Sequence, residues 1–350
     1  MAKDLCIEII EKCLNNCQFC SSNSNCQKEY IIDFITFKRV IDHFMKNGVI
    51  EELSLSGGEP FLHPELLKIV EYAKSYSIKT VIFTSGVIEA SDISDIDRKI
   101  YAEEMIKKLE EVDKNEPDNA FLKGKIKNYY TNILKRKYSS IPREMLEQLK
   151  NIGLDKIVFD YQAYEAERDN IVMGRCEEAR QSFLNSLITA SLVGLNVDVH
   201  FIPMKVNYQE IGDILELLEI ANVGSISILN FIPQGRGRIN KDKLQLFNEE
   251  LNEFFELLNK YRKKFSGKIR VGIPLQEENL HKCNAGLEKL DIKFDGTVLP
   301  CQTFKEITEE DCQKYNIALA SIYTNLEDVI ISGTGTRRKT LCKQFYNFKN

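Results

Sequence analysis

Hydrophobic and polar positions alternate between two periods along the first 230 or so residues. Short apolar runs predict six strands, at residues 5–11, 52–56, 79–84, 156–161, 196–202 and 225–232. Between them, apolar spacings of three and four predict helices at 35–48, 66–76, 142–151, 176–194 and 208–221. Strands that alternate with helices pair in parallel, and catalytic groups then collect at the carboxyl ends of the strands. Six such units are fewer than the eight of a closed barrel, so we expect an α/β fold with a partial (β/α)6 barrel resembling a TIM barrel.

Two segments depart from this alternation. Residues 88–143 are strongly charged, with helical stretches around 101–113 and 120–136, and predict a helical insertion that is either a solvated cap, a lid or a docking surface. After residue 240 a long helix at 246–264 and a strand at 269–272 are followed by a hairpin signal, Asp295-Gly296, between 290–294 and 297–300. We therefore expect one domain at 1–240, interrupted by the insertion, and a small C-terminal α+β domain at 241–350.

Composition limits the classes of function. The 350 residues contain no stretch of ~18 apolar residues, so no membrane span is expected. The acidic N-terminus argues against a secretion signal, and a net charge of −5 gives no general attraction to nucleic acid. Ten cysteines without an export signal indicate a reducing compartment rather than a disulfide framework. The sequence predicts a cytoplasmic protein.

Three of the cysteines lie within eight residues, directly after the first predicted strand. Cys13, Cys17 and Cys20 can converge on one centre, and ligation by sulfur alone suits zinc, Cu(I) or iron–sulfur. A structural zinc site almost always has four protein ligands, whereas this local group has three. The spacing favours a [4Fe–4S] cluster with one open iron. A zinc site completed by ligands elsewhere, in a non-catalytic metal-binding scaffold, is the alternative from another class.

The pattern CxxxCxΦC, with Phe19 as its aromatic residue, resembles the signature of the radical S-adenosylmethionine (SAM) superfamily. Gly57-Gly58-Glu59-Pro60, which follows the second predicted strand, resembles that family's GGE motif. The resemblance implies that the open iron binds SAM and that an electron from the cluster cleaves it. The resulting 5′-deoxyadenosyl radical would abstract a hydrogen atom from the substrate.

The same resemblance implies further cofactor-binding residues. Phe19 would lie beside the adenine, Gly57, Gly58 and Glu59 would meet the SAM amino group, and Ser85 would lie near SAM at the end of the third strand. Asp160 and Gln162 end the fourth strand, where related enzymes often carry a Ser-Leu-Asp-Gly-like segment that this chain lacks. Arg236 could pair with the SAM carboxylate. His200 and Cys176 are candidate catalytic residues. The alternatives are structural roles: Phe19 as a packing aromatic, Ser85 as a capping hydroxyl, Arg236 as a surface arginine, His200 as a core histidine and Cys176 as an incidental thiol.

A second group of cysteines lies near the C-terminus. Cys283-x12-Gly296-x4-Cys301 resembles the hairpin that opens SPASM and twitch domains. The resemblance implies an auxiliary [4Fe–4S] cluster with Cys283, Cys301 and Cys342 as ligands and Cys312 as the fourth. If Cys312 is not a ligand, the open iron could bind substrate, and zinc is the alternative metal.

Together these features predict a radical SAM oxidoreductase or maturase. The resemblance points first to maturation of a ribosomal peptide or protein, with an electron donor such as flavodoxin or ferredoxin. Because Cys13 lies so near the start of the chain, no N-terminal domain for a peptide leader is expected. A dehydrogenase or epimerase acting on a small molecule, such as an aminocyclitol, a sugar or a nucleotide, is therefore the alternative.

Overall fold

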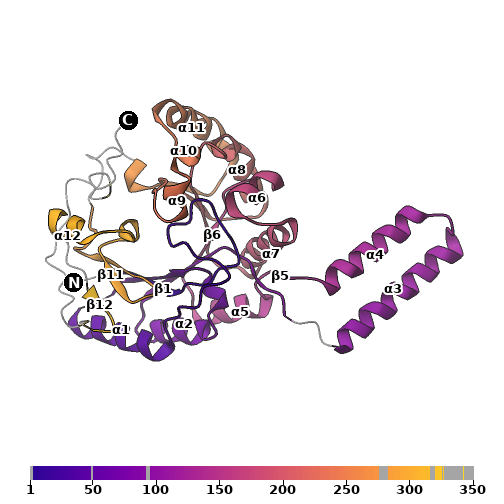
Figure 1. Ribbon diagram of the computed structural model, residues 1–350, viewed down its shortest axis with the longest axis horizontal. Helices are drawn as coiled ribbons and strands as arrows, with labels where there is room; N and C mark the ends of the chain where they lie inside the picture. The colour runs from indigo at the N-terminus through magenta and orange to yellow at the C-terminus, as the bar shows by residue number, and fades with distance from the viewer. Residues whose placement is uncertain are drawn as a thin grey trace. The chain divides into compact units, whose positions relative to one another are not determined.

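The computed structural model describes residues 3–48, 50–91, 95–275, 283–315, 320–324, 326 and 342. The chain divides into two compact units, one formed by residues 1–87 with 140–350 and the other by residues 88–139. Each unit is described by itself below, and Figure 1 shows the elements of both.

A ten-stranded sheet runs through the larger unit in the order β12-β11-β10-β1-β2-β3-β6-β7-β8-β9. Its strands are β1 (Asp4–Ile10), β2 (Glu52–Gly57), β3 (Lys79–Thr84), β6 (Lys156–Asp160), β7 (Val197–Phe201), β8 (Ser225–Ile228), β9 (Lys268–Val271), β10 (Lys289–Ile292), β11 (Thr297–Leu299) and β12 (Ala320–Ser321). The six strands predicted from the sequence are all present and pair in parallel from β1 to β8. The edge strands β9 and β12 do not pair with each other among the described residues, so the sheet is a partial barrel, as predicted.

Helices connect the parallel strands and cover one face of the sheet (Figure 1). They are α1 (Phe34–Asn47), α2 (Leu66–Ser75), α5 (Arg143–Ile152), α6 (Ala166–Met173), α7 (Glu177–Val193) and α8 (Ile211–Ile220), followed by α9 (Arg236–Ile239), α10 (Lys241–Leu244), α11 (Asn248–Tyr261) and α12 (Glu309–Tyr315). The caps follow the sequence: Asp33 accepts a hydrogen bond from the Thr36 amide at the start of α1, and Gly153 ends α5 at φ +91°.

Strand alternation divides β1 between an apolar face and a polar face. Leu5, Ile7 and Ile9 are fully buried on one face, and Cys6 and Glu8 lie on the other. The polar face continues along the sheet, because Cys6 pairs with Ser54 on β2 and with Asp291 on β10. The interior of the partial barrel is therefore lined with polar side chains.

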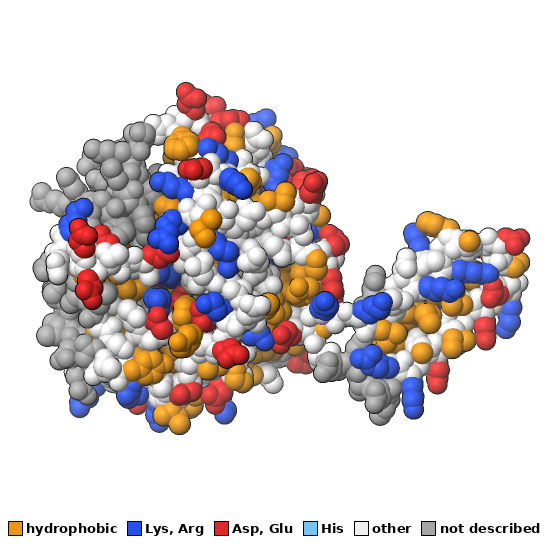
Figure 2. Space-filling view, in the orientation of Figure 1, with side chains coloured by type: hydrophobic (Ala, Val, Ile, Leu, Met, Phe, Trp, Pro, Cys, Tyr) orange, Lys and Arg blue, Asp and Glu red, His pale blue; other side chains and the backbone are white. Residues whose placement is uncertain are grey.

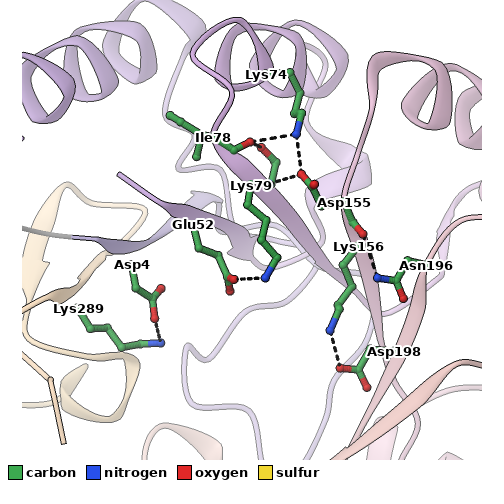
Figure 3. A network of polar contacts seen from close by, with 11 residues as sticks. Asp4, Glu52, Lys74, Ile78, Lys79, Asp155, Lys156, Asn196, Asp198 and Lys289 are labelled. Carbon is green, nitrogen blue, oxygen red and sulfur yellow. Dashed lines mark hydrogen bonds and ion pairs between the residues drawn. The ribbon is translucent and has the colours of Figure 1, made fainter. Parts of the chain in front are cut away.

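Ion pairs join neighbouring strands at the amino ends of the sheet (Figure 3). Lys289 of β10 contacts Asp4 of β1 at 2.8 Å, and Lys79 of β3 pairs with Glu52 of β2. Lys156 and Asp198 form a third pair at 3.4 Å. These contacts hold the edge of the barrel opposite to the cysteine loop, and they leave the carboxyl ends free for chemistry.

Strands β9 and β10 place the C-terminal part of the chain in the same sheet as the N-terminal part. β9 pairs in parallel with β8, and β10 pairs in parallel with β1. The Asp295-Gly296 turn then reverses the chain, so that β11 runs antiparallel to β10, as the hairpin signal predicted. The C-terminal α+β region thus extends both edges of the barrel sheet.

The smaller unit consists of the antiparallel helices α3 (Asp95–Asn115) and α4 (Ala120–Leu134), which we call the helical hairpin. A two-stranded sheet of β4 (Ile88–Glu89) and β5 (Tyr138–Ser139) joins its two ends. The helices fall where the sequence predicts helical stretches, and the small sheet was not predicted. In the part of the chain that the structure describes, no helix is long and apolar enough to span a membrane.

Candidate functional site

The three N-terminal cysteines lie on the loop that leaves β1 at the carboxyl end of the sheet. Cys13 is buried, and Cys17 and Cys20 are half-buried. The Cys13 amide donates to the Asn25 carbonyl at 3.1 Å, and the Cys20 amide donates to the Cys17 carbonyl at 3.3 Å. The loop therefore folds back on itself and brings the three thiols together.

The end of α6 forms a platform for this loop. The amides of Asn16 and Gln18 donate to the carbonyls of Met173 and Val172, at 3.2 and 2.8 Å. Gly174 follows at φ +65°, and a Cβ there would stand 3.0 Å from the Asn16 carbonyl oxygen. The loop thus depends on a helix that lies more than 150 residues later in the chain.

Arg236 holds the same loop from a second direction. Its Nε donates to the Cys17 carbonyl at 2.7 Å, its Nη2 donates to the Ser24 carbonyl at 2.9 Å, and its amide donates to the Cys20 carbonyl at 3.0 Å. Gly235 precedes it at φ +55°, with the Cys20 carbonyl only 2.5 Å from where a Cβ would be. These contacts use two of the five N–H groups of the guanidinium, so Nη1 and the second N–H of Nη2 are left for the predicted pairing with a SAM carboxylate.

The electrostatics of the three thiols fit a metal–sulfur site. Burial, together with the charges of Glu59 and Cys20, raises the pKa of Cys13 to about 12. Burial also raises the pKa of Cys17 well above its usual value, and Cys20 and Cys13 add to this effect. Raised pKa values keep these groups as thiols, so their deprotonation needs a nearby cation, and iron would supply that charge.

The donor set of this site consists of cysteine sulfur. Among the residues described, no three His, Cys, Asp or Glu side chains are arranged to hold one ion. Three cysteine sulfurs on one loop suit the [4Fe–4S] cluster predicted from the sequence, whereas a structural zinc ion almost always takes four protein ligands.

The glycines of the GGEP turn are required by contact with the chain itself. A Cβ on Gly57, which has φ +129°, would lie 2.2 Å from the Ile10 carbonyl oxygen, and one on Gly58 would lie 2.1 Å from that of Lys12. The close approach lets the amides of Gly58 and Glu59 donate to the carbonyls of Ile10 and Lys12, at 2.6 and 2.8 Å. The glycines thus admit the end of β1 and the residues after it, and the predicted contact of Gly57 and Gly58 with the SAM amino group stays a prediction.

The Glu59 carboxylate is fully buried and bound to the end of β3. It accepts hydrogen bonds from the Thr84 hydroxyl and the Ser85 amide, each at 2.7 Å, and from the Ser85 hydroxyl and the Phe61 amide. Burial raises its pKa, and these hydrogen bonds lower it again. Glu59 and Ser85, both predicted from the sequence, therefore lie together beside Cys13.

Asp160, the last residue of β6, and Gln162, two residues later, have different environments. Burial raises the pKa of Asp160 to about 6, while the positive charge of Arg175 opposes the rise. Gln162 is fully buried, and its amide joins the His200 carbonyl at 3.0 Å to the Ile202 amide at 2.8 Å. Gln162 thus fixes the turn after β7, whereas the negative charge of Asp160 helps to raise the pKa of Cys17.

Arg175 is a central residue of the site that the sequence did not indicate. It is buried, and its Nη2 donates to the carbonyls of Ser85 and Asp160, at 3.0 and 3.2 Å. Its guanidinium lies 4.1 Å from the centre of the Phe183 ring and contacts Asp169 at 3.4 Å. No hydrogen-bond partner of its Nε is found among the described residues. The positive charge of the guanidinium acts to lower the pKa of Cys13 and Cys17, against the larger effect of their burial.

The remaining candidates from the sequence lie around this centre or outside it. Phe19 packs against an apolar cluster formed by Val172, Met173, Met204, Phe231 and Leu244. His200 lies 5.1 Å from Phe83 between ring centres, and burial lowers its pKa to about 4, so its imidazole is neutral. Cys176 is exposed just before α7. The structure thus gives Cys176 no contact with the cysteine loop among the interactions described.

Three of the four C-terminal cysteines come together in a second centre. Cys283 and Cys342 are buried with Ala285 and Phe304, and Cys301 packs against them. Burial raises the pKa of the Cys301 thiol. Cys312 lies on α12 and is not a member of this cluster. The structure thus brings Cys283, Cys301 and Cys342 together and leaves Cys312 apart.

A buried polar bridge connects the two cysteine centres, and the sequence did not indicate it. Lys305 follows the η6 turn (Gln302–Phe304) after Cys301, and its ammonium pairs with Glu8 and donates to the hydroxyls of Ser21 and Ser22, at 3.2 and 2.7 Å. Both charged side chains are under one tenth exposed. Lys305 therefore ties the turn after Cys301 to β1 through an ion pair and to the loop after Cys20 through two hydroxyl groups.

The comparisons with known proteins agree with this site. The model of the radical SAM superfamily matches residues 7–118, which include Cys13, Cys17, Cys20 and the GGEP turn. Residues 7–118 thus match a radical SAM domain, as predicted, and the cofactors of such a domain are a [4Fe–4S] cluster and SAM.

Two curated relatives are similar over most of the chain. The PqqA peptide cyclase of Gluconobacter oxydans is 22% identical over 94% of this chain and 75% of that protein. The PqqA peptide cyclase of Bradyrhizobium diazoefficiens is 21% identical over 92% of this chain and 72% of its own length. The similarity thus includes the C-terminal region with the second cysteine centre.

Two solved structures share the fold. Streptococcus suis SuiB bound to S-adenosylmethionine has a TM-score of 0.60 at 15% identity, over 100% of this chain and 69% of its own. Native anSMEcpe with bound AdoMet has a TM-score of 0.56 at 12% identity, over 88% of this chain and 79% of its own. At these identities the likeness supports the architecture of the partial barrel.

Proposed function

We propose that this radical SAM enzyme modifies a peptide or protein, in the manner of a maturase that forms or oxidises bonds in a ribosomal peptide. The observation that carries the proposal is the similarity to two PqqA peptide cyclases over more than nine tenths of the chain. SuiB, which shares the fold, has also been solved with its precursor peptide SuiA. The polar interior of the partial barrel suits a substrate with many hydrogen-bonding groups.

In this proposal Cys13, Cys17 and Cys20 hold the first [4Fe–4S] cluster. When bound, the cluster and SAM supply a strongly oxidising radical that abstracts hydrogen. The protein supplies the buried pocket, and Glu59, Ser85 and Asp160 place acceptor oxygens around it for the SAM ammonium and ribose. The apolar cluster behind Phe19 keeps water away from one side of the loop.

The second cysteine centre is proposed to hold an auxiliary [4Fe–4S] cluster. Cys283, Cys301 and Cys342 already pack together, which supports them as ligands. Cys312, on α12, is the proposed fourth ligand. We place the boundary between the catalytic domain and the auxiliary domain at residues 240 and 241, and we expect the enzyme to act in the cytoplasm with flavodoxin or ferredoxin as electron donor.

Anaerobic reconstitution tests this proposal. We expect about eight irons per chain and formation of 5′-deoxyadenosine when dithionite and SAM are added. Cys17→Ala should abolish this reaction, because it removes a ligand of the first cluster. Cys301→Ala should leave SAM cleavage intact and stop turnover of the peptide substrate. If both variants cleave SAM as the wild type does, the assignment of the two centres is wrong.

A nucleotide is the second candidate substrate. Over 86 residues, a quarter of the chain, the sequence is 29% identical to the S-adenosylmethionine-dependent nucleotide dehydratase of Selenomonas ruminantium. SAM cleavage that is stimulated by nucleoside triphosphates and not by peptides would favour this candidate. A dehydrogenase or epimerase acting on such a small molecule would then replace the maturase.

A further inference from the structure

The helical hairpin has a thin core of its own. Among its described residues, only Val112 and Tyr130 are less than one tenth exposed. Tyr130 is held by Lys108, whose ammonium lies 5.5 Å from the ring centre, and by a hydrogen bond to Glu104. Two helices with so little shared apolar surface are marginally stable by themselves. The hairpin therefore gains from further burial.

Large apolar side chains of the hairpin face solvent on both helices. Phe121 and Tyr129 of α4 are 74% and 59% exposed, and Ile106 and Ile100 of α3 are 53% and 45% exposed. Phe121, Lys125 and Tyr129 follow one another at a spacing of four, so they share one face of α4. Figure 2 shows hydrophobic side chains gathered along the hairpin between charged ones. Such a surface is typical of a site that binds another protein.

The two helices carry opposite charge. From residue 95 to 118 the sequence has nine Asp or Glu and five Lys or Arg, whereas from 120 to 137 it has six Lys or Arg and no Asp or Glu. The hairpin as a whole is close to neutral, so it does not have the strong positive charge that a polyphosphate partner would require. A partner must instead offer an acidic face to α4 and a basic face to α3, together with apolar side chains.

A second copy of the hairpin offers all three. We propose that the chain forms a homodimer in which two hairpins pack as an antiparallel four-helix bundle, with α3 of each copy against α4 of the other. A two-fold axis makes such an interface self-complementary, because the contact between α3 of one copy and α4 of the other occurs twice. The bundle buries the four exposed apolar side chains of each copy in its core. This inference does not depend on the proposed substrate.

The first test is the mass of the full-length protein in solution. The chain has a mass of 40.3 kDa, and light scattering at micromolar concentration should give twice this value. Phe121→Glu should yield a monomer, whereas Ile220→Glu, which charges an apolar residue of α8 that is 81% exposed, should yield a dimer. Circular dichroism checks that both variants are folded. A wild type that stays monomeric, or a dimer that both variants leave intact, overturns the proposal.

Charge reversal tests the pairing of the helices. The triple variant Lys125→Glu, Lys127→Glu, Lys135→Glu should weaken the homodimer by at least about tenfold, and so should Glu103→Lys, Glu110→Lys, Glu111→Lys. An equimolar mixture of the two should form a heterodimer, because the acidic α4 of the first then meets the basic α3 of the second. If the mixture remains monomeric while each variant is folded, α3 does not pack against α4 of a second copy.

Discussion

Substitution of Gly58 by alanine tests whether the GGEP turn is shaped by contact with the end of β1. A Cβ at this position would stand 2.1 Å from the Lys12 carbonyl oxygen and 2.4 Å from that of Glu11. Both neighbours are backbone atoms, so no side chain can move aside. The turn must therefore retreat from β1 by more than an ångström, or the chain at residues 11–12 must shift.

The cost follows from what that retreat breaks. The hydrogen bonds from Gly58 to Ile10 and from Glu59 to Lys12 are lost, each worth about 1 kcal/mol. Residual strain from the added methyl group contributes about 1–3 kcal/mol. We expect the free energy of unfolding to fall by about 3–5 kcal/mol in total. Since Glu59 moves with the turn, its contacts to Thr84 and Ser85 weaken as well.

Urea unfolding followed by circular dichroism measures this change. Gly124→Ala is the matched control, because a Cβ there meets no atom within 4 Å and the residue lies inside α4. That substitution should leave stability unchanged or raise it by about 0.5–1 kcal/mol. A Gly58→Ala protein within about 0.5 kcal/mol of the wild type would refute the steric reasoning.

Three further predictions concern the loop, the bridge and the interior. Gly235→Ala should strain the φ +55° backbone and push the Cys20 carbonyl away, so that iron bound per chain after anaerobic reconstitution falls; retention of the full iron content would contradict this. Lys305→Met should destabilise the fold by about 3–5 kcal/mol in urea, since it leaves Glu8 charged and buried, whereas Lys264→Met, from an exposed pair, should cost less than about 1 kcal/mol. Burial lowers the pKa of His200 from 6.5 to about 4, so the unfolded chain binds a proton that the folded chain does not. Stability should fall by about 2–3 kcal/mol as the pH drops from 6.5 to 4, and His200→Gln should remove that part of the slope.

The barrel strands were predictable because each is an apolar run bounded by helices of clear amphipathic period. Helix α6 was missed, since its residues, 166–173, show little apolar periodicity. Its position matters, because the carbonyls of Val172 and Met173 hold the cysteine loop. No local sequence pattern predicts a contact between segments that lie so far apart in the chain.

The cysteines were predictable from their spacing, but the supporting residues were not. Arg175 follows a glycine, and no motif marks it as part of the site, yet the fold buries it among Ser85, Asp160 and Phe183. Arg236 and Gln162 were expected to contact the cofactor, and the hydrogen bonds described above for their side chains go to backbone groups. A sequence motif identifies which side chains are present, but only the packing of distant strands decides what each one contacts.

The parallel pairing of β1 with β10 has a consequence for the order in which the chain can fold during synthesis. Asp4 and Lys289 are 285 residues apart, so β1 is synthesised long before the strand that covers its outer edge. Until then that edge is open to mispairing with other nascent chains. Iron delivered early would find Cys13, Cys17 and Cys20 already made, whereas Cys283, Cys301 and Cys342 are made more than 260 residues later.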